Sequence, residues 1–354
     1  MTPKNLLLSE FKPRSALVLE EHIPARAKFP VIDAHNHFGY REFSTIPFYY
    51  GQSGWGMPDV KQGLDLMDEL NIRVAINLDG AIYDQLMANL ERYKEPYPDR
   101  FAIFTGIDWR KVDESDFGEK QARKIEADVK AGAQGLKVFR ELGLEYRDKN
   151  GKLLMPDDPR MDPIWEQAGE LGIPVLIHSS DPVAFFWPLD ETNERWDEIN
   201  ATMPNGAYCG KDYPTHIQLV EAQLHIVEKH PKTKFISAHV LSYSENLKYV
   251  AAALDKYPNL FVDIGERIGE LGRQPYSARK FLIQYQDRVV FGTDIPNDKR
   301  TYQIYFRALE TMDEYFDYGR QQGRYCIYGM YLPDDVLQKI YTGNVMKIIP
   351  GLKI

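Results

Sequence analysis

Two histidines separated by one residue, His35 and His37, are the first side chains in the chain whose types and spacing could do chemistry. They follow the apolar pair Val31-Ile32, and Gly39 comes soon after them. Side chains at positions i and i+2 of a strand project to the same side, so a strand ending here would present two imidazole rings together. Taken alone, the pair is better explained as two surface histidines that happen to lie close together. A metal site requires further ligands later in the chain.

Four more side chains with nitrogen or oxygen donors stand in or at the end of short apolar runs. These are Lys137 in 135–139, His178 in 174–178, His239 in 234–239 and Asp294 in 289–294. Each has an ordinary explanation by itself: a buried hydrogen-bonded histidine, a helix N-cap or a charge at a strand edge. Chance placement of the whole set at the same end of several predicted strands is a much weaker explanation.

The segments that must position these residues alternate between short apolar runs and longer runs with helical spacing. Strands are predicted at 30–37, 74–78, 101–105, 135–139, 174–178, 234–239, 260–264 and 289–294. Helices are predicted at 59–70, 82–94, 118–131, 160–171, 215–230, 244–256, 276–286 and 299–316, before a C-terminal helical tail. A doubly wound open sheet gives a similar alternation, but eight repeats favour a closed (β/α)8 TIM barrel, an α/β fold.

A barrel would bring the candidate residues together, because the C-terminal ends of its strands surround one site. Residues 1–28 are expected to form an N-terminal extension and residues 29–354 a single metal-dependent barrel domain. A barrel of this kind has about 31 residues per βα unit, and the segments after the fourth and fifth strands are longer than that. We therefore expect the loops 39–57, 140–159 and 180–213 to lie on one face, over the site.

Composition and charge narrow the class of protein. Acidic residues outnumber basic ones, 52 to 43, for a net charge of −9, which argues against a nucleic-acid or anionic-membrane partner. Cys209 and Cys326 are too few for a disulfide framework or a cysteine-based zinc site. The N-terminus has no signal-like apolar region and no segment reaches the length of a membrane span, so a soluble, cytoplasmic protein is expected. A protein from which a signal peptide had been removed would have the same N-terminal sequence.

The candidate residues and their neighbours resemble the amidohydrolase superfamily of metal-dependent barrel enzymes. The resemblance rests on Val31-Ile-Asp-Ala-His-Asn-His37, Val175-Leu-Ile-His178, Ile236-Ser-Ala-His239 and Phe291-Gly-Thr-Asp294. Tyr341-Thr-Gly-Asn-Val-Met346 is similar to a segment that often closes the branch containing aminocarboxymuconate-semialdehyde decarboxylase and related lactonases. Some decarboxylases of that branch carry Glu in place of the first histidine. His35 therefore leaves both hydrolysis and decarboxylation open.

The resemblance implies a role for each residue. In the similar enzymes, the residues matching His35, His37, His178 and Asp294 hold the metal, and Asp294 would accept a proton from water. His239 would act as general acid or base. The ligand types suit one divalent ion, Zn²⁺ in the first place and Mn²⁺ as an alternative.

A second metal ion would require Lys137. In binuclear relatives the corresponding lysine is carboxylated and bridges two ions, whereas in mononuclear relatives the position is free for other work. We favour one metal, with Lys137 as a ligand only if the centre is binuclear.

The remaining candidates concern the substrate. Arg267, directly after the seventh strand, could bind a substrate carboxylate, and an ion pair with a neighbouring glutamate is an equal alternative. Trp187 belongs to an aromatic-rich loop that either caps a pocket or packs against a neighbouring subunit. The other histidines are expected to be solvated; they are His22, His216, His225 and His230.

The sequence thus predicts a metal-dependent hydrolase acting at the carbonyl centre of a small lactone or amide. The alternative is a metal-dependent non-oxidative decarboxylase of a small unsaturated or aromatic carboxylic acid. Two other classes are weighed against these. One is a Schiff-base barrel enzyme with Lys137 as nucleophile, and the other is a non-catalytic barrel, which would have no need for the histidines. Assembly into a homo-oligomer is compatible with the sequence.

Overall fold

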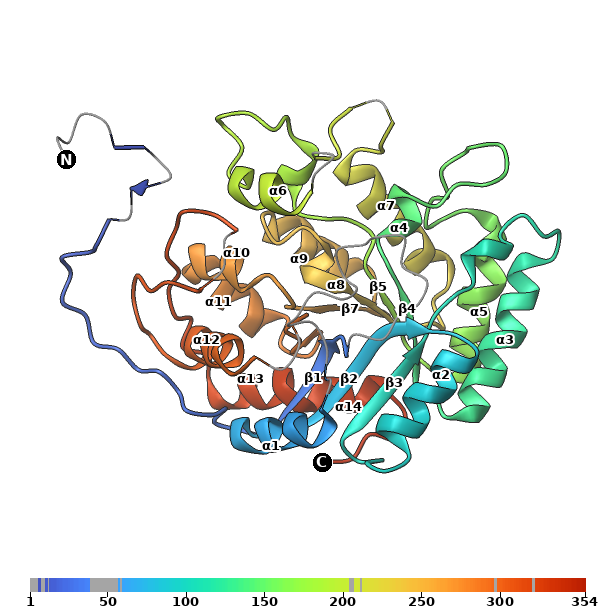
Figure 1. Cartoon of the computed structure of the whole chain (residues 1–354), viewed down its shortest axis with the longest axis horizontal. Helices are drawn as coiled ribbons and strands as arrows, with labels where there is room; N and C mark the ends of the chain where they lie inside the picture. The colour runs from blue at the N-terminus through green and yellow to red at the C-terminus, as the bar shows by residue number, and fades with distance from the viewer. Residues whose placement is uncertain are drawn as a thin grey trace.

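In the computed structural model of the protein, eight parallel strands surround the centre (Figure 1). The structure describes residues 6–7, 10–11, 13–38, 57, 59–203, 207–210, 212–295, 298–319 and 322–354. The strands are β1 Val31–Asn36, β2 Ile72–Ala81, β3 Phe101–Thr105, β4 Gly135–Val138, β5 Val175–Ile177, β6 Phe235–Ser237, β7 Leu260–Asp263 and β8 Val289–Val290.

Each strand pairs in parallel with the next one along the chain. Two backbone hydrogen bonds join β1 to the segment after β8: the Ala34 amide donates to the Phe291 carbonyl at 2.9 Å, and the Asp294 amide donates to the His35 carbonyl at 2.7 Å. The (β/α)8 barrel predicted from the sequence is therefore confirmed.

Helices between the strands cover the outside of the barrel (Figure 1). They are α1 Val60–Leu70, α2 Asp84–Asn89 with the π-helical turn Leu90–Lys94, α3 Phe117–Ala131, α5 Asp162–Leu171, α7 His216–Lys229, α9 Leu247–Lys256, α11 Pro275–Gln284 and α12 Lys299–Glu310. Four short elements occupy the segments that follow strands: α4 Glu141–Leu144, α6 Trp196–Thr202, α8 Ala238–Leu241 and α10 Ile268–Arg273. The C-terminal tail consists of α13 Asp334–Gln338, the π-helical turn Lys339–Gly343 and α14 Asn344–Ile348.

Local side-chain caps explain where several helices begin. The Thr215 hydroxyl and the Gln218 side chain form a reciprocal capping box at the start of α7. The Asp298 carboxylate accepts from the Thr301 amide at 2.8 Å and starts α12. The helix predicted over 299–316 ends at Glu310, because the backbone of Thr311 is extended.

The interior of the barrel is filled by small and branched apolar side chains, as the fold requires. They are Ile32, Ala34, Val74, Ile76, Leu78, Ala102, Phe104, Leu176, Ile236, Ala238 and Val290, and they form one cluster with Val345, Ile348 and Ile349 of the tail. The tail therefore closes the end of the barrel at which the strands begin. The polar candidate residues lie at the opposite end, where the strands finish.

Residues 13–28 carry no helix or strand and lie outside the barrel (Figure 1). Their last part is tied to α1 by the Ala27 amide, which donates to the Leu70 carbonyl at 3.2 Å. The loop expected at 39–57 lies outside the described residues except for Met57. No helix in the described ranges has the length and apolar character needed to cross a bilayer.

Candidate metal centre

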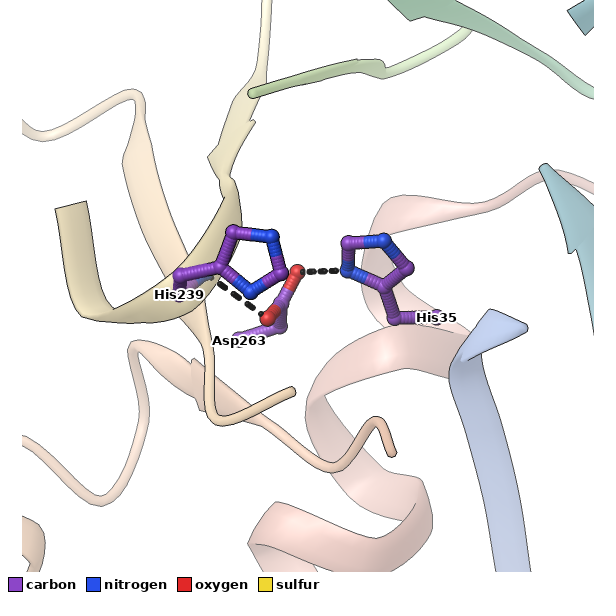
Figure 2. Close-up of side chains that lie close together, drawn as sticks. All are labelled: His35, His239 and Asp263. Atoms are coloured by element: carbon purple, nitrogen blue, oxygen red, sulfur yellow. Dashed lines mark hydrogen bonds and ion pairs between the residues drawn. The ribbon is translucent and has the colours of Figure 1, made fainter. Parts of the chain in front are cut away.

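The rings of His35 and His37 are each oriented by a buried carboxylate. His35 Nδ1 donates to Asp263 Oδ2 at 2.8 Å (Figure 2), and His37 Nδ1 lies 3.4 Å from Asp79 Oδ1. A carboxylate accepts and does not donate, so these contacts place a proton on each Nδ1. Each ring then presents Nε2 on its other side, which is the arrangement that carboxylates impose on histidine ligands of metals.

Asp294 completes a three-residue donor set with these two nitrogens. Its Oδ1 atom lies 3.2 Å from His35 Nε2 and 3.2 Å from His37 Nε2. The three ligand atoms all lie within 4.8 Å of one another. Two imidazole nitrogens and one carboxylate oxygen suit Zn²⁺ or Mn²⁺, so the residues at the ends of β1 and β8 fit a divalent ion.

The charges of this group stabilise one another. Burial alone would raise the pKa of Asp294, but the charge of His35 and hydrogen bonds from His35 and His37 hold it well below its usual value. Burial likewise opposes a charge on His35, yet the carboxylates of Asp294 and Asp263 raise the pKa of His35 to about 9. Asp294 is therefore a carboxylate at neutral pH.

Lys137 of β4 reaches the same centre. Its side chain is buried, with Nζ 3.2 Å from His35 Nε2 and 5.0 Å from the centre of the Phe139 ring. The ammonium thus lies beside the nitrogen that faces Asp294, and its charge lowers the pKa of His35.

His239 lies against the same group from the end of β6. Its ring stacks on that of His35 with centroids 5.0 Å apart, and its backbone amide donates to Asp263 Oδ1 at 3.0 Å (Figure 2). Nδ1 donates to the Gly265 carbonyl at 2.8 Å, which leaves Nε2 as an acceptor 3.6 Å from Asp294 Oδ2. Burial and the nearby charges of His178 and Arg267 hold the pKa of His239 well below its usual value, so the ring is neutral.

The backbone that carries His239 has an unusual conformation. The four residues from His239 to Ser242 have φ between 50° and 62°, so α8 is a left-handed turn rather than an ordinary helix. This conformation costs about 1–2 kcal/mol per residue for side chains other than glycine. Strain of this kind persists where the surrounding structure enforces it, often at functional sites. Here the turn brings His239 Nδ1 to the Gly265 carbonyl.

His178 joins the ring cluster with a different orientation. Its ring centroid lies 4.3 Å from that of His239, whereas Nε2 faces the Ser180 carbonyl at 3.1 Å and Asp181 Oδ1 at 3.6 Å. Nδ1 is therefore the nitrogen of His178 that remains available to a metal. Within the described ranges, His178 belongs to no group of three residues whose ligand atoms lie within 4.8 Å of one another.

The two residues expected to bind substrate have different surroundings. Arg267 directly precedes α10 and its side chain is buried, and its charge lowers the pKa of His239. Trp187 ends a short 3-10 turn, Val183–Phe186, and is 47% exposed, so it lies outside the buried centre.

Several residues that build the centre were not identified from the sequence. Asp263 ends the apolar strand β7, just as Asp294 follows the apolar strand β8. A search for polar residues at the ends of apolar strands could therefore have found Asp263, and also Asp79 near the end of β2.

His216 was expected to be solvated but is buried, and its Nε2 donates to the Ser242 carbonyl at 2.8 Å. His230 is also buried, against Asp162. Both lie on the inner side of α7 or at its end, where a predicted helix alone does not show which face is covered.

Comparisons with known proteins agree with this architecture. Residues 32–350 match the model of a family described as Amidohydrolase. None of the curated proteins matches the chain significantly.

Solved structures show the same fold at low sequence identity. A 2,6-dihydroxybenzoate decarboxylase from Rhizobium aligns with a TM-score of 0.56 and 16% identity, over 90% of this chain and 98% of its own. A dihydroxybenzoic acid decarboxylase from Polaromonas, with bound manganese and an inhibitor, aligns at 0.55 and 17%, over 90% and 96%. A probable 2-pyrone-4,6-dicarboxylic acid hydrolase from Acinetobacter baumannii aligns at 0.51 and 12%, over 90% and 99%.

Proposed function

The chain belongs to the amidohydrolase family, and from that premise we propose that it is a metal-dependent hydrolase that cleaves a small lactone or amide at its carbonyl carbon. The observation that carries the proposal is the position of Asp294. One of its oxygens faces the two Nε2 atoms of His35 and His37, and the other faces His239. A carboxylate placed between a nitrogen-rich metal site and a neutral histidine is what water activation requires.

We propose a single divalent ion, Zn²⁺ with Mn²⁺ as the alternative, held by His35, His37 and Asp294, with His178 as a fourth ligand through Nδ1. When bound, such an ion polarises a carbonyl group and makes water a usable nucleophile near neutral pH. Asp263 and Asp79 hold the two imidazole rings in the required tautomer.

Asp294 and His239 carry the proton transfers in this proposal. Asp294 is ionised and accepts a proton from the water that attacks the carbonyl carbon. His239 is neutral with Nε2 unprotonated, so it can take that proton from Asp294 and deliver it to the leaving oxygen or nitrogen. The hydroxyl group of the water then stays on the carbonyl carbon, and the second product leaves protonated.

Lys137 is proposed to remain an unmodified amine rather than a carboxylated bridge between two ions. The face of the Phe139 ring 5.0 Å from Nζ favours a cation at that position. Metal analysis should then give one ion per chain in both the natural protein and Lys137→Met. A carboxylated lysine would instead make the substitution lose metal.

The function is tested with Asp294→Asn, assayed on a panel of lactones and amides at saturating Zn²⁺. Loss of the general base should reduce kcat by about 100-fold or more. Zn²⁺ content is measured on the same sample, and Asp287→Asn, at an exposed position paired with Lys339, serves as the control. An Asp294→Asn protein that retains full hydrolytic activity would refute the proposal.

One observation favours a second function, non-oxidative decarboxylation. His239 presents an unprotonated Nε2 to the centre, which could take a proton from solvent and pass it to the carbon atom that loses CO2. A decarboxylase would release CO2 from an unsaturated or aromatic acid and incorporate a solvent proton into the product. Detection of that CO2 without any hydrolytic product would replace the first proposal by the second.

A further inference from the structure

The N-terminal arm, residues 13–28, is held against the barrel by its second half. The backbone amide of His22 donates to Asp313 Oδ2 at 2.7 Å, and His22 Nδ1 lies 2.7 Å from Asp313 Oδ1. The backbone amide of Lys28 donates to Glu310 Oε1 at 3.0 Å. These bonds fix the second half of the arm beside the C-terminal end of α12.

The first half of the arm contains an apolar segment, residues 14–20, with the sequence Arg-Ser-Ala-Leu-Val-Leu-Glu. In the described ranges, none of its backbone groups is hydrogen-bonded to the barrel, and the Leu17 amide donates within the segment to the Ser15 hydroxyl. Leu17 is 61% exposed and Val18 is 99% exposed. Figure 1 shows the arm stretched out beside the barrel. An extended apolar run with unpaired backbone groups has the character of an edge strand that lacks a neighbour.

The apolar segment is complementary to a second copy of itself. An antiparallel pair with Leu17 opposite Leu17 of the second copy places Arg14 opposite Glu20 at both ends of the pair, and Ala16 opposite Val18. Opposite charges and apolar side chains directly across from each other stabilise antiparallel strands, whereas a parallel pair would put like charges together. A contact between identical surfaces of this kind is what two-fold symmetry requires.

The anchored half of the arm supports such a pair in two ways. Its bonds to the barrel restrict the arm before a partner arrives, so less conformational freedom is lost on pairing. A two-stranded ribbon is marginally stable by itself and needs an apolar surface beside it. Exposed Met312 and Tyr315 flank the anchor residue Asp313 and offer such a surface.

The charges of the arm and of the whole chain oppose a lipid surface as the partner. Glu20 and Glu21 follow the apolar residues directly, and the net charge of the chain is −9. Both would be repelled by anionic lipid headgroups. The same negative charge does not prevent self-pairing, because each Glu20 would lie opposite an arginine.

We propose that residues 14–20 pair antiparallel with the same residues of a second copy, so that the protein is a two-fold symmetric dimer joined through its N-terminal arms. Backbone hydrogen bonds along the apolar segment supply the affinity, and the two Arg14–Glu20 pairs fix direction and register. The arm lies outside the barrel, so this dimer does not depend on the metal centre or on the proposed hydrolysis.

The first test is sedimentation velocity of the full chain over a range of concentrations. The natural protein should sediment at twice its mass of 41.0 kDa. Arg14→Glu and Glu20→Arg each place like charges opposite one another at both ends, so either change should weaken dimerisation about tenfold or more. An equimolar mixture of the two variants should recover the natural affinity, because both ends then pair opposite charges. Lys61→Glu, at an exposed position on α1, is the control and should leave the dimer unchanged.

The second test is disulfide cross-linking at the two-fold axis. Directly opposed Cα atoms of antiparallel strands are about 4.5–5.5 Å apart, which is within the range for a disulfide. Leu17→Cys is made in a Cys209→Ser background, because Cys209 is exposed. Mild oxidation should link it into a covalent dimer. Tyr276→Cys in the same background is an equally accessible control and should stay uncrosslinked.

The outcomes separate this dimer from other uses of the arm. A natural protein that stays monomeric at every concentration would overturn the proposal, and co-sedimentation of that monomer with phosphatidylcholine vesicles would assign the arm to a lipid surface instead. A dimer that tolerates both charge reversals and gives no Leu17→Cys cross-link would place the interface elsewhere and equally reject the proposal. Circular dichroism checks that each variant is folded, which is expected because the arm carries no helix or strand.

Discussion

At the scale of single residues, the centre depends on His35 being held between two carboxylates. Asp263 holds Nδ1 at 2.8 Å and Asp294 faces Nε2 at 3.2 Å. Burial opposes a charge on this ring, but the two carboxylates outweigh it and raise the pKa of His35 to about 9. A metal ion bound as proposed would therefore compete with a proton for the same nitrogen, Nε2.

This competition predicts how metal affinity depends on pH. Because the pKa of His35 is raised from 6.5 to about 9, the proton stabilises the protein fully below pH 6.5, and this stabilisation is lost as the pH rises to 9. An ion must displace that proton, so its affinity should rise about tenfold per pH unit up to pH 9 and then level off. Competition with a chromogenic chelator at fixed ionic strength measures the affinity.

The control for this prediction is Asp263→Asn. Removing one of the two carboxylates lowers the pKa of His35, so the plateau of metal affinity should begin at a lower pH. A metal affinity that stays constant between pH 6.5 and 9 in the natural protein would contradict the prediction.

At the scale of secondary-structure elements, the close approach of β1 to the segment after β8 fixes the position of His35. A Cβ atom at Gly292 would lie 2.6 Å from His35 Cβ and 3.1 Å from the His35 backbone nitrogen. Real Cβ atoms do not pack this closely, so only glycine allows the two segments to lie side by side here. Gly292 thus helps to position His35, the first of the proposed ligands.

Gly292→Ala should accordingly affect metal binding and stability together. The added methyl group must push β1 away, which should lower the free energy of unfolding by about 1–3 kcal/mol and lower metal affinity. Urea unfolding and chelator competition measure the two effects. Gly343→Ala is the matched control, because the nearest atom there is the Gln338 carbonyl oxygen at 3.5 Å. Normal metal affinity in Gly292→Ala would show that the barrel absorbs the methyl group elsewhere.

Irregular backbone explains why the sequence could not give the full geometry of β1. Strict alternation would put Asp33 on the same side as His35 and His37. The pairing of β1 with β2 shifts between Asp33 and Asn36, and the Asp33 carboxylate instead accepts from the Tyr302 hydroxyl of α12 at 2.6 Å. The two histidines were thus correctly placed together, although the regular strand assumed for them is interrupted.

The left-handed turn after β6 was equally beyond sequence reasoning. Val240 is branched at Cβ and would be expected in a strand or helix, yet its φ is 56°. The turn is held by contacts with the neighbouring strand segment, such as the bond from His239 Nδ1 to the carbonyl of Gly265 after β7. Local propensity carries no information about such contacts.

At the scale of the whole molecule, the eight strands could be predicted from short runs of apolar residues. Parallel barrel strands are buried on both faces, so their sequences do not have to alternate between apolar and polar residues. The same reasoning located His35, His37 and Asp294 at one end. It could not select Asp263 and Asp79 as the partners of the two histidines, because those pairings depend on distances between side chains of different strands. Nor could it orient His178, whose Nε2 is turned toward Ser180 and Asp181.

The proposed ion would join the two strands that close the barrel, since His35 and His37 belong to β1 and Asp294 follows β8. Binding to the folded state alone stabilises it, by about 2.7 kcal/mol at a free concentration 100 times Kd. Removal of the metal with a chelator should therefore lower Tm by about 3–6 °C. Differential scanning calorimetry measures the shift, and restoration by added Zn²⁺ is the control. Identical Tm values with and without chelator would argue against an ion at this closure.

The junction of β1 with the segment after β8 also has a consequence for the synthesis of the protein on the ribosome. His35 and His37 emerge early, but their partner Asp294 follows 257 residues after His37. At about 5–20 residues per second, translation of that interval takes about 13–50 s. During this time the two histidines have no carboxylate from β8 beside them. The proposed ion would therefore bind at the very end of translation or after the chain is released, and a nascent chain stalled before Asp294 should not retain it.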